Sequence, residues 1–348
     1  MKRVSAIGVA TALLIGAAPA VTQTASADSA VVLPTIPAHS ALRTLLSASA
    51  ARHPAGKAER RAAVGRGDIT GDGVGDLVTV QSGSNRIDVH AGVLGGSRAF
   101  TTSTAVGTTG ADRTWIGQGD LTGDGNRDLA TLSTDGTMRI SVHSGTYNGT
   151  STFNPEFTWA TGWGAGSLFT LVDFVGKDPN NPTELDGLAD ILFRYSGDNS
   201  YYLYINEGLN ANGVPQLANA GALLNSMQAV TSVSIADVTN DGFPDLYMTF
   251  TDGSARLLDI FAEQDSSGAW HEKWYVLQAT GATSADVHTL VDVTGDGQPD
   301  LVTRVKATGE LHCTAHAPVW NPGAPSTLFD PAREQLLSSG WNGYRLVA

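Results

Sequence analysis

The sequence of 348 residues is poor in cysteine and in basic residues. Cys313 is the only cysteine, so no disulfide can form within the chain, and something else must stabilise the fold. It lies in an alternating stretch with Leu311 and Ala315, which predicts a buried, unreactive thiol. The chain has 34 acidic but only 21 basic residues, and its net charge is −13. This balance argues against nucleic-acid binding, which requires a basic surface.

Long hydrophobic runs and the common catalytic motifs are also missing. Beyond the first 27 residues no stretch is long enough to span a bilayer, so we expect a soluble, exported protein. The sequence has no Gly-x-Ser-x-Gly motif, no His-Glu-x-x-His motif and no phosphate-binding loop. Any chemistry of this chain must therefore be sought in other patterns.

The N-terminal part differs from the rest in composition. Residues 1–27 have a positive start, an apolar stretch and an Ala-x-Ala cleavage site, which predict a secretory signal peptide and a secreted, extracellular protein. Residues 28–61 are rich in Ala, Ser, Pro and basic residues, and we interpret them as a disordered linker or pro-segment. Residues 62–348 are predicted to form one folded domain.

A nine-residue acidic loop occurs five times in that domain. The first copy runs from Asp68 to Asp76, with oxygen-bearing side chains at loop positions 1, 3, 5 and 9 and with Gly73 at position 6. Calcium binds several hard oxygen ligands that a short, sharply turning segment brings round one ion. Glycine suits position 6 because the turn requires a backbone conformation that other residues reach only at a cost.

The other copies follow in register. Three are intact and occupy residues 120–128, 237–245 and 292–300, whereas nine inserted residues separate Asp173 from the closing segment 186–190 of the third copy. The first Asp of successive copies recurs after 52, 53, 64 and 55 residues, and the insertion accounts for nine of the 64. Three Asp in each loop make up 15 of the 34 acidic residues, so the predicted metal ligands mainly explain the excess of acidic residues.

Ligands can be assigned within each loop by residue type. Asp at positions 1, 5 and 9 would supply carboxylates, Thr at position 3 a hydroxyl, and the residue at position 7 its backbone carbonyl. The alternative is a turn in which Asp only caps backbone amides, and it is stronger for the third loop, where Val175 replaces the Thr. The predicted ligands of four to five Ca²⁺ ions are Asp68, Thr70, Asp72, Val74, Asp76, Asp120, Thr122, Asp124, Asn126, Asp128, Asp173, Asp186, Asp190, Asp237, Thr239, Asp241, Phe243, Asp245, Asp292, Thr294, Asp296, Gln298 and Asp300.

The period of the loops predicts the fold. A repeat of just over 50 residues with period-2 alternation is typical of a propeller blade. In the second unit, strands at 129–132 and 138–142 flank an Asp-Gly turn; a more variable segment such as 157–160 follows, and then a run such as 168–172 leads into the next loop. We predict an all-β propeller of about five four-stranded blades, with six or seven as alternatives. The tail 340–348 is expected to close the ring by pairing near residues 62–66.

The repeated pattern Asp-x-Thr-Gly-Asp-Gly-x-x-Asp-Leu resembles a known family. It is similar to the FG-GAP or VCBS repeats of integrin α-subunit propellers, of several calcium-bearing propeller lectins and of many secreted actinobacterial proteins. The resemblance covers roughly residues 62–348. It implies a β-propeller with a calcium ion in the loop that joins the first and second strands of each blade. It does not imply one activity, because the fold carries lectins, adhesion modules and accessory domains of enzymes.

Three histidines suggest a zinc site at first sight. Aligned on the turn glycines, His90, His143 and His316 occupy one equivalent position in three blades, and Asn206 occupies it in the third repeat. Such positions are far apart in a propeller, so these side chains cannot share an ion. We interpret them as a feature of the repeat.

Aromatic residues suggest the binding function. Trp163 and Trp341 each follow a glycine in a connection between units, and Tyr202 lies near a turn. If exposed, their rings would stack on sugars; the alternative is that they pack between blades. We predict a non-catalytic, calcium-stabilised module that binds a glycan or cell-wall polysaccharide. The alternatives are a polysaccharide lyase or hydrolase on a propeller scaffold and a protein-interaction or adhesion scaffold.

Overall fold

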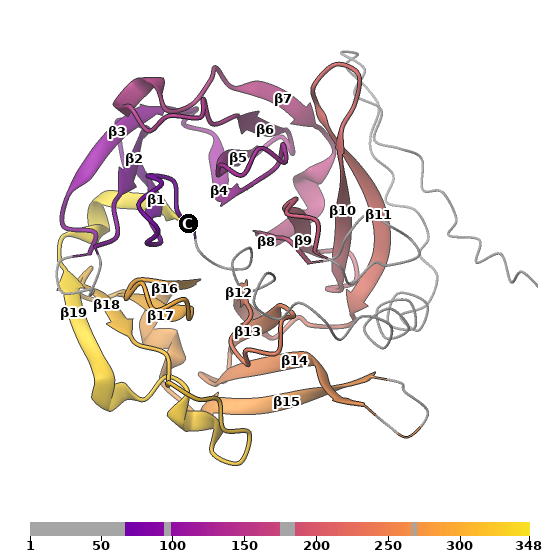
Figure 1. Ribbon diagram of the computed structural model, residues 1–348, viewed down its shortest axis with the longest axis vertical. Coiled ribbons are helices and arrows are strands. Elements are labelled where there is room, and N and C mark those ends of the chain that lie inside the picture. Colours follow the sequence, from indigo (N-terminus) through magenta and orange to yellow (C-terminus); the bar gives the residue numbers. More distant parts are fainter. Residues whose placement is uncertain (1–66, 94–98, 175–184, 265, 267–269) are drawn as a thin grey trace, which may run out of the picture.

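Each repeat folds into a sheet of four antiparallel strands, and five such sheets stand around one axis (Figure 1). The computed structural model describes residues 67–93, 99–174, 185–264, 266 and 270–348. The predicted all-β propeller is confirmed, and it has five blades. Among the described residues, no helix has the length and apolar character that a bilayer span requires.

Some predictions concern residues outside the described part of the chain. These are the signal peptide at 1–27, the linker or pro-segment at 28–61, the expected closing partner at 62–66, and Val175, which lies within residues 175–184 of the third loop. They stay predictions.

Blade 2 shows the plan of the repeat. Its strand β4 (Arg113–Gly119) lies nearest the axis, followed outward by β5 (Asp128–Ser133), β6 (Met138–Ser141) and β7 (Phe157–Ala160). The acidic loop joins the first strand to the second, as the family resemblance implied. Blades 3, 4 and 5 repeat this order with β8 (Gly166–Val172), β9 (Asp190–Tyr195), β10 (Tyr201–Leu209) and β11 (Pro215–Leu224); β12 (Val230–Ala236), β13 (Asp245–Phe250), β14 (Ala255–Gln264) and β15 (Trp270–Gln278); and β16 (Ala285–Val291), β17 (Asp300–Val305), β18 (Leu311–Thr314) and β19 (Glu334–Ser338).

Short 3₁₀ turns mark the connections, and a glycine turn in blade 2 shows how tightly they pack. Gly136 has a φ of +78°, and a Cβ atom there would lie 2.3 Å from the backbone nitrogen of Gly164. The Asp-Gly turn between β5 and β6 therefore lies directly against the connection to blade 3. The 3₁₀ turns are η1 (Gly149–Ser151), η2 (Trp163–Ala165), η3 (Ala282–Ser284), η4 (Pro325–Thr327), η5 (Pro331–Arg333) and η6 (Trp341–Gly343).

Blade 1 combines strands from the two ends of the described chain. Its innermost strand is β20 (Tyr344–Val347), which pairs with β1 (Leu77–Gln81), and β2 (Arg86–His90) and β3 (Ser103–Thr108) follow outward. The backbones of Val78 and Ala348 exchange hydrogen bonds of 2.8 and 2.9 Å. The tail closes the ring as predicted, but its described partner is β1, because β20 takes the place that the first strand holds in the other blades.

The hydrophobic core is divided among the five interfaces between blades. Strand residues alternate between the two faces of a blade, and both faces are covered by a neighbour. In blade 4, Leu246 and Met248 pack towards blade 3, whereas Tyr247 and Leu257 pack towards blade 5. Cys313 is buried between blades 5 and 1, as predicted, and burial raises the pKa of its thiol.

Two arginines reach from one blade to the backbone of the next. Arg304 on β17 donates from Nη1 to the carbonyl oxygens of Trp341 and Tyr344, at 3.1 and 2.8 Å, and its other nitrogens bind Asp286. Arg194, at the same position of β9, donates to the carbonyl oxygen of Val230 at 2.8 Å. Buried carbonyls at the entry to blades 1 and 4 are thereby satisfied.

Replacing Arg304 with Met should lower the free energy of unfolding by about 2 kcal/mol, because it removes donors from a buried carbonyl and unpairs Asp286. Urea unfolding followed by tryptophan fluorescence measures this. Lys306→Met is the control, since Lys306 is exposed in the same blade and should cost no more than about 0.5 kcal/mol. Equal effects of the two changes would contradict the idea that Arg304 stabilises the contact between blades 5 and 1.

Candidate functional site: the acidic loops, the rim and the axis

Each acidic loop is closed by the buried carboxylate at position 9. In the first loop, Asp76 Oδ2 accepts hydrogen bonds from the backbone N–H groups of Ile69 and Thr70, both at 2.8 Å. Its Oδ1 accepts one from Gly92, just beyond the third strand of the blade, at 2.9 Å. One side chain thus fixes both the loop and the strand beyond it. Asp128, Asp190 and Asp300 repeat both kinds of bond, and Asp245 repeats the bonds within the loop.

Positions 1 and 5 shape the bend. In the second loop, Asp120 Oδ1 accepts from the Gly123 N–H at 2.7 Å, and Oδ2 accepts from the Gly125 N–H at 2.8 Å. Asp124 Oδ1 accepts from the Asn126 N–H at 2.8 Å. Such bonds are what we expect if Asp only caps backbone amides, the alternative to calcium binding. A carboxylate oxygen has two lone pairs, so such a bond still leaves one for a cation.

The third loop keeps this geometry despite its insertion. Asp173 Oδ2 accepts from the Gly187 N–H at 2.8 Å, and Asp186 Oδ1 accepts from the Leu188 N–H at 3.0 Å. Asp190 closes the loop like the other position-9 residues. The insertion therefore leaves the described residues of this loop in the same arrangement as those of the intact loops.

Glycine at position 6 has the positive φ that the turn was expected to require. Position 4 also adopts a positive φ: it is Gly71, Gly123 and Gly295 in three loops and Asn240, with φ +67°, in the fourth. Sequence reasoning missed position 4, although its Gly and Asn residues are a visible signal. The position-6 values are +87° for Gly73, +84° for Gly125, +83° for Gly187, +93° for Gly242 and +83° for Gly297.

Several loop oxygens have no partner. The hydroxyl oxygens of Thr122, Thr239 and Thr294, all at position 3, are buried without a hydrogen bond, and so is Asp173 Oδ1 at position 1 of the third loop. Buried polar atoms are nearly always satisfied, so these acceptors fit a hard cation at the predicted ligand positions. Among the described residues, however, no group of three or more His, Cys, Asp or Glu side chains is placed so that it could hold a metal ion.

Burial sets the electrostatics of the loops. It raises the pKa of Asp76 and of Asp128 to about 6 and that of Asp173 to about 7, against the opposing effect of backbone hydrogen bonds. Neighbouring loop carboxylates raise these pKa values further. The ionised loops are therefore costly on their own, and a divalent cation would remove that cost.

Side chains in or just after the third strand of two blades reach the acidic loop of the preceding blade. His316 Nε2 lies 2.8 Å from the Val238 carbonyl oxygen in the fourth loop, and Asn206 Nδ2 donates to the Leu121 carbonyl oxygen in the second loop at 2.9 Å. His90 does not occupy the equivalent position, because Gly92 binds the position-9 carboxylate in blade 1. The alignment of His90 with His143 and His316 used the turn glycines as a common reference. That reference shifts between blades, because the glycine follows position 9 by 7, 8 and 9 residues in blades 1, 2 and 5.

The aromatic residues expected to stack on sugars are buried. Exposed fractions are 4% for Trp163, 2% for Trp341 and 7% for Tyr202. The Trp163 ring lies 5.0 Å from the rings of Phe193 and Tyr204. The 3₁₀ turns η2 and η6 fold each indole back into an interface between blades. Of the two interpretations, exposed rings and packing between blades, the structure shows the second for these three residues.

A different tryptophan is exposed. Trp274, on the outermost strand of blade 4, is 41% exposed, and no other aromatic side chain that the structure describes is as open. Its ring lies 6.3 Å from that of Phe250, over which Arg256 is placed at 4.4 Å. Arg256 Nη2 also donates to Asp252 Oδ2 at 2.9 Å. We call Asp252, Arg256 and Trp274 the rim patch.

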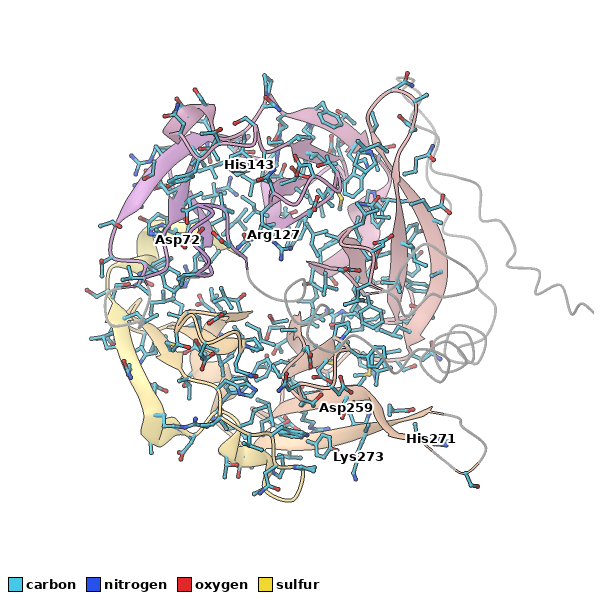
Figure 2. The ribbon with its side chains drawn as sticks, in the orientation of Figure 1. Asp72, Arg127, His143, Asp259, His271 and Lys273 are labelled. Carbon is cyan, nitrogen blue, oxygen red and sulfur yellow. The ribbon has the colours of Figure 1, made fainter. Side chains whose placement is uncertain are left out.

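A cavity of about 160 Å³ lies at the axis, between the innermost strands of the blades. Trp115 and Gln118 of β4 line it, together with Arg127 from the second loop. Figure 2 places Arg127 at the inner edge of the ring. Burial lowers the pKa of Arg127, and the carboxylates of Asp120 and Asp173 oppose that effect.

Comparison with known proteins identifies the repeat. Residues 185–248, from the end of the third loop into β13, match the model of the FG-GAP-like repeat. The chain is thus a five-bladed propeller that contains an FG-GAP-like repeat. A search of curated proteins gave no match to the chain.

Among the solved structures that match the FG-GAP-like propeller is a lectin from Agrocybe aegerita, described as specifically recognising non-reducing terminal N-acetylglucosamine. The two are 20% identical with a TM-score of 0.37, and the match covers 79% of this chain and 65% of the lectin chain, less than two thirds of its length. A likeness at this level says nothing about the ligand of the FG-GAP-like propeller.

Replacing Gly125 of the FG-GAP-like propeller with Ala should cost about 1–2 kcal/mol of unfolding free energy. The new Cβ would meet no atom within 4 Å, so the cost is that of the positive φ alone. Gly107→Ala is the matched control, because its site is equally open and lacks a left-handed φ. Urea midpoints measure both. A similar midpoint for the two variants would contradict the importance of the bend.

Proposed function

We propose that this protein is a secreted, calcium-stabilised, non-catalytic module that binds a glycan or cell-wall polysaccharide. The observation that carries the calcium part is the set of unpartnered oxygens at position 3 of the second, fourth and fifth loops and at Asp173 Oδ1; in the first loop the Thr70 hydroxyl donates to Asp68 Oδ1. The predicted signal peptide supports secretion. In an oxidising compartment a chain with one cysteine has no internal disulfide, so bound ions take over part of the stabilisation.

In each intact loop the carboxylates at positions 1, 5 and 9, the hydroxyl at position 3 and the carbonyl at position 7 would hold the ion. In the third loop, Asp173, Asp186 and Asp190 would supply carboxylates, and backbone oxygens would have to complete the site. The bound charge offsets carboxylates whose pKa values burial raises. The ions are therefore proposed as part of the architecture, because each loop lies where the first and second strands of a blade meet.

Thr294→Val tests the calcium part, because its effect on stability should be opposite without and with calcium. In EGTA the variant should be as stable as the parent or more stable, because it removes a buried hydroxyl without a partner. In millimolar calcium it should be less stable, because it removes a ligand. Melting temperatures in both buffers measure this.

Thr303→Val, on β17 outside the loop, is the control and should shift the melting temperature equally in both buffers. Metal analysis of the purified protein gives the stoichiometry, which should be four to five Ca²⁺ per chain. A protein without bound calcium that melts at the same temperature in EGTA would overturn the proposal.

The non-catalytic part rests on where the perturbed carboxyl groups lie. Active sites need acids and bases whose pKa values burial and neighbours have shifted. Six carboxyl groups whose pKa burial raises all belong to acidic loops. These groups are Asp76, Asp128, Asp173, Asp245, Asp292 and Asp300. The buried position of these groups in the repeated loops thus explains why their pKa values are raised.

The rim patch supports a glycan as the ligand. A sugar ring offers apolar C–H faces to an aromatic plane and hydroxyl groups to charged neighbours. Trp274 supplies the open plane, and the paired Arg256 and Asp252 supply a donor and an acceptor beside it. A neutral polysaccharide would tolerate the acidic surface of the protein.

Trp274→Ala should weaken binding to the polysaccharides that a glycan array identifies by about tenfold, the loss expected for an aromatic contact worth about 1.4 kcal/mol. Isothermal titration with and without chelator measures it. Leu336→Ala, an exposed apolar residue on blade 5, should leave binding unchanged. Unaltered affinity in Trp274→Ala, or depolymerisation of a bound polysaccharide by the parent, would contradict the proposal.

A further inference from the structure

The residues that line the axial cavity differ in blade 2 from the residues at the same repeat positions in blades 3 to 5. Two residues before the loop, blade 2 has Gln118, where blades 3, 4 and 5 have the apolar Leu171, Ile235 and Leu290; the first repeat has Arg66 there, outside the described residues. Three blades are built without a polar side chain at this position, so the architecture does not require Gln118. Gln118 and the three apolar side chains all line the cavity.

Position 8 of the loop shows a second departure in the same blade. Blade 2 has Arg127 there, and Arg127 lines the cavity. A guanidinium group near the axis gives blade 2 a donor that the other blades lack at this position. The residues at position 8 of the remaining loops are Gly75, Ala189, Pro244 and Pro299.

Gln118 leaves an acceptor unused. Its Nε2 donates to the carbonyl oxygen of Asp76 at 2.9 Å, which fixes the side-chain amide. Its Oε1 is then buried with no hydrogen bond. A ligand that carries hydroxyl groups could donate to this oxygen and accept from Arg127.

Trp115 adds an apolar plane to the same wall. A Cβ atom at Gly117 would lie 2.3 Å from the indole ring, so the glycine lets the ring lie against the strand. The ring is half-buried, lines the cavity, and stands 5.6 Å from that of Phe169. Blades 4 and 5 face it with aliphatic residues such as Val233 and Val287.

We propose that the axial cavity is a pocket for one pyranose ring of a sugar, held by Trp115, Gln118 and Arg127. The ring would place a C–H face on Trp115, donate a hydroxyl to Gln118 Oε1 and accept from Arg127. A cavity of about 150 Å³ can hold one six-membered ring such as benzene, and the axial cavity, at about 160 Å³, is of that size. This pocket rests on the proposed glycan-binding function, but it is separate from the rim patch.

The test uses the full chain and the monosaccharides glucose, galactose, mannose, N-acetylglucosamine and glucuronate. Titration calorimetry should detect millimolar or tighter binding of at least one of them. Gln118→Leu and Arg127→Ala should each weaken that binding about tenfold. Both replacements introduce residues that other blades carry at these positions, so the fold should accept them. Trp274→Ala should leave monosaccharide binding unchanged.

A second measurement does not depend on the variants. The indole N–H resonance of Trp115, assigned with Trp115→Phe, should shift on addition of the sugar that binds. The pocket is overturned if no monosaccharide binds, if Gln118→Leu and Arg127→Ala bind as the parent does, or if only Trp274→Ala loses binding. If polysaccharide binding at the rim survives any of these results, the proposed function stands without the pocket; if no glycan binds at all, both fall.

Discussion

The whole ring depends on how the carboxylate at position 9 of each loop is bound. In blade 5, Asp300 Oδ2 accepts the N–H of Val293 at the start of the loop, and Oδ1 accepts that of His316 beyond the third strand. A buried carboxylate is stable only when such donors surround it, and bonds to an ionised group are stronger than neutral ones. One side chain therefore sets the bend of the loop and the position of three strands at once.

The loops support one another around the ring. The Gly75 N–H donates to the Asp292 carbonyl oxygen at 2.9 Å, which joins the first loop to the fifth, and the Ala189 N–H donates to the Asp120 carbonyl oxygen in the same way. His316 and Asn206 add side-chain bonds to a neighbouring loop. Because these contacts are shared, a disturbance in one loop is felt by the next, and effects on two adjacent loops should not be additive.

The repeat, the strands beside the loops and the burial of Cys313 were predictable from sequence, but the placement of the aromatic rings was not. The loop spacing predicted the five blades, and the strand predicted at 138–142 is β6, which ends one residue earlier. The sequence could not decide between exposed and packed rings for Trp163 and Tyr202, because period-2 alternation marks an exposed face only when a sheet has one, whereas a blade is covered on both faces. Trp274 is open because it lies on the outermost strand of its blade, a property of the assembled ring that alternation does not reveal. Gln118 and Arg127, by contrast, stand out when the repeats are simply compared.

The closure of blade 1 has a consequence for synthesis. Blades 2 to 5 are each built from consecutive strands and can form in turn as the chain emerges, but β1 lacks its inner partner until residues 344–347 exist. Until then it presents unpaired backbone groups, which are a template for aggregation with other chains. Loss of residues 344–347 would thus leave the inner edge of β1 open to strands of other chains.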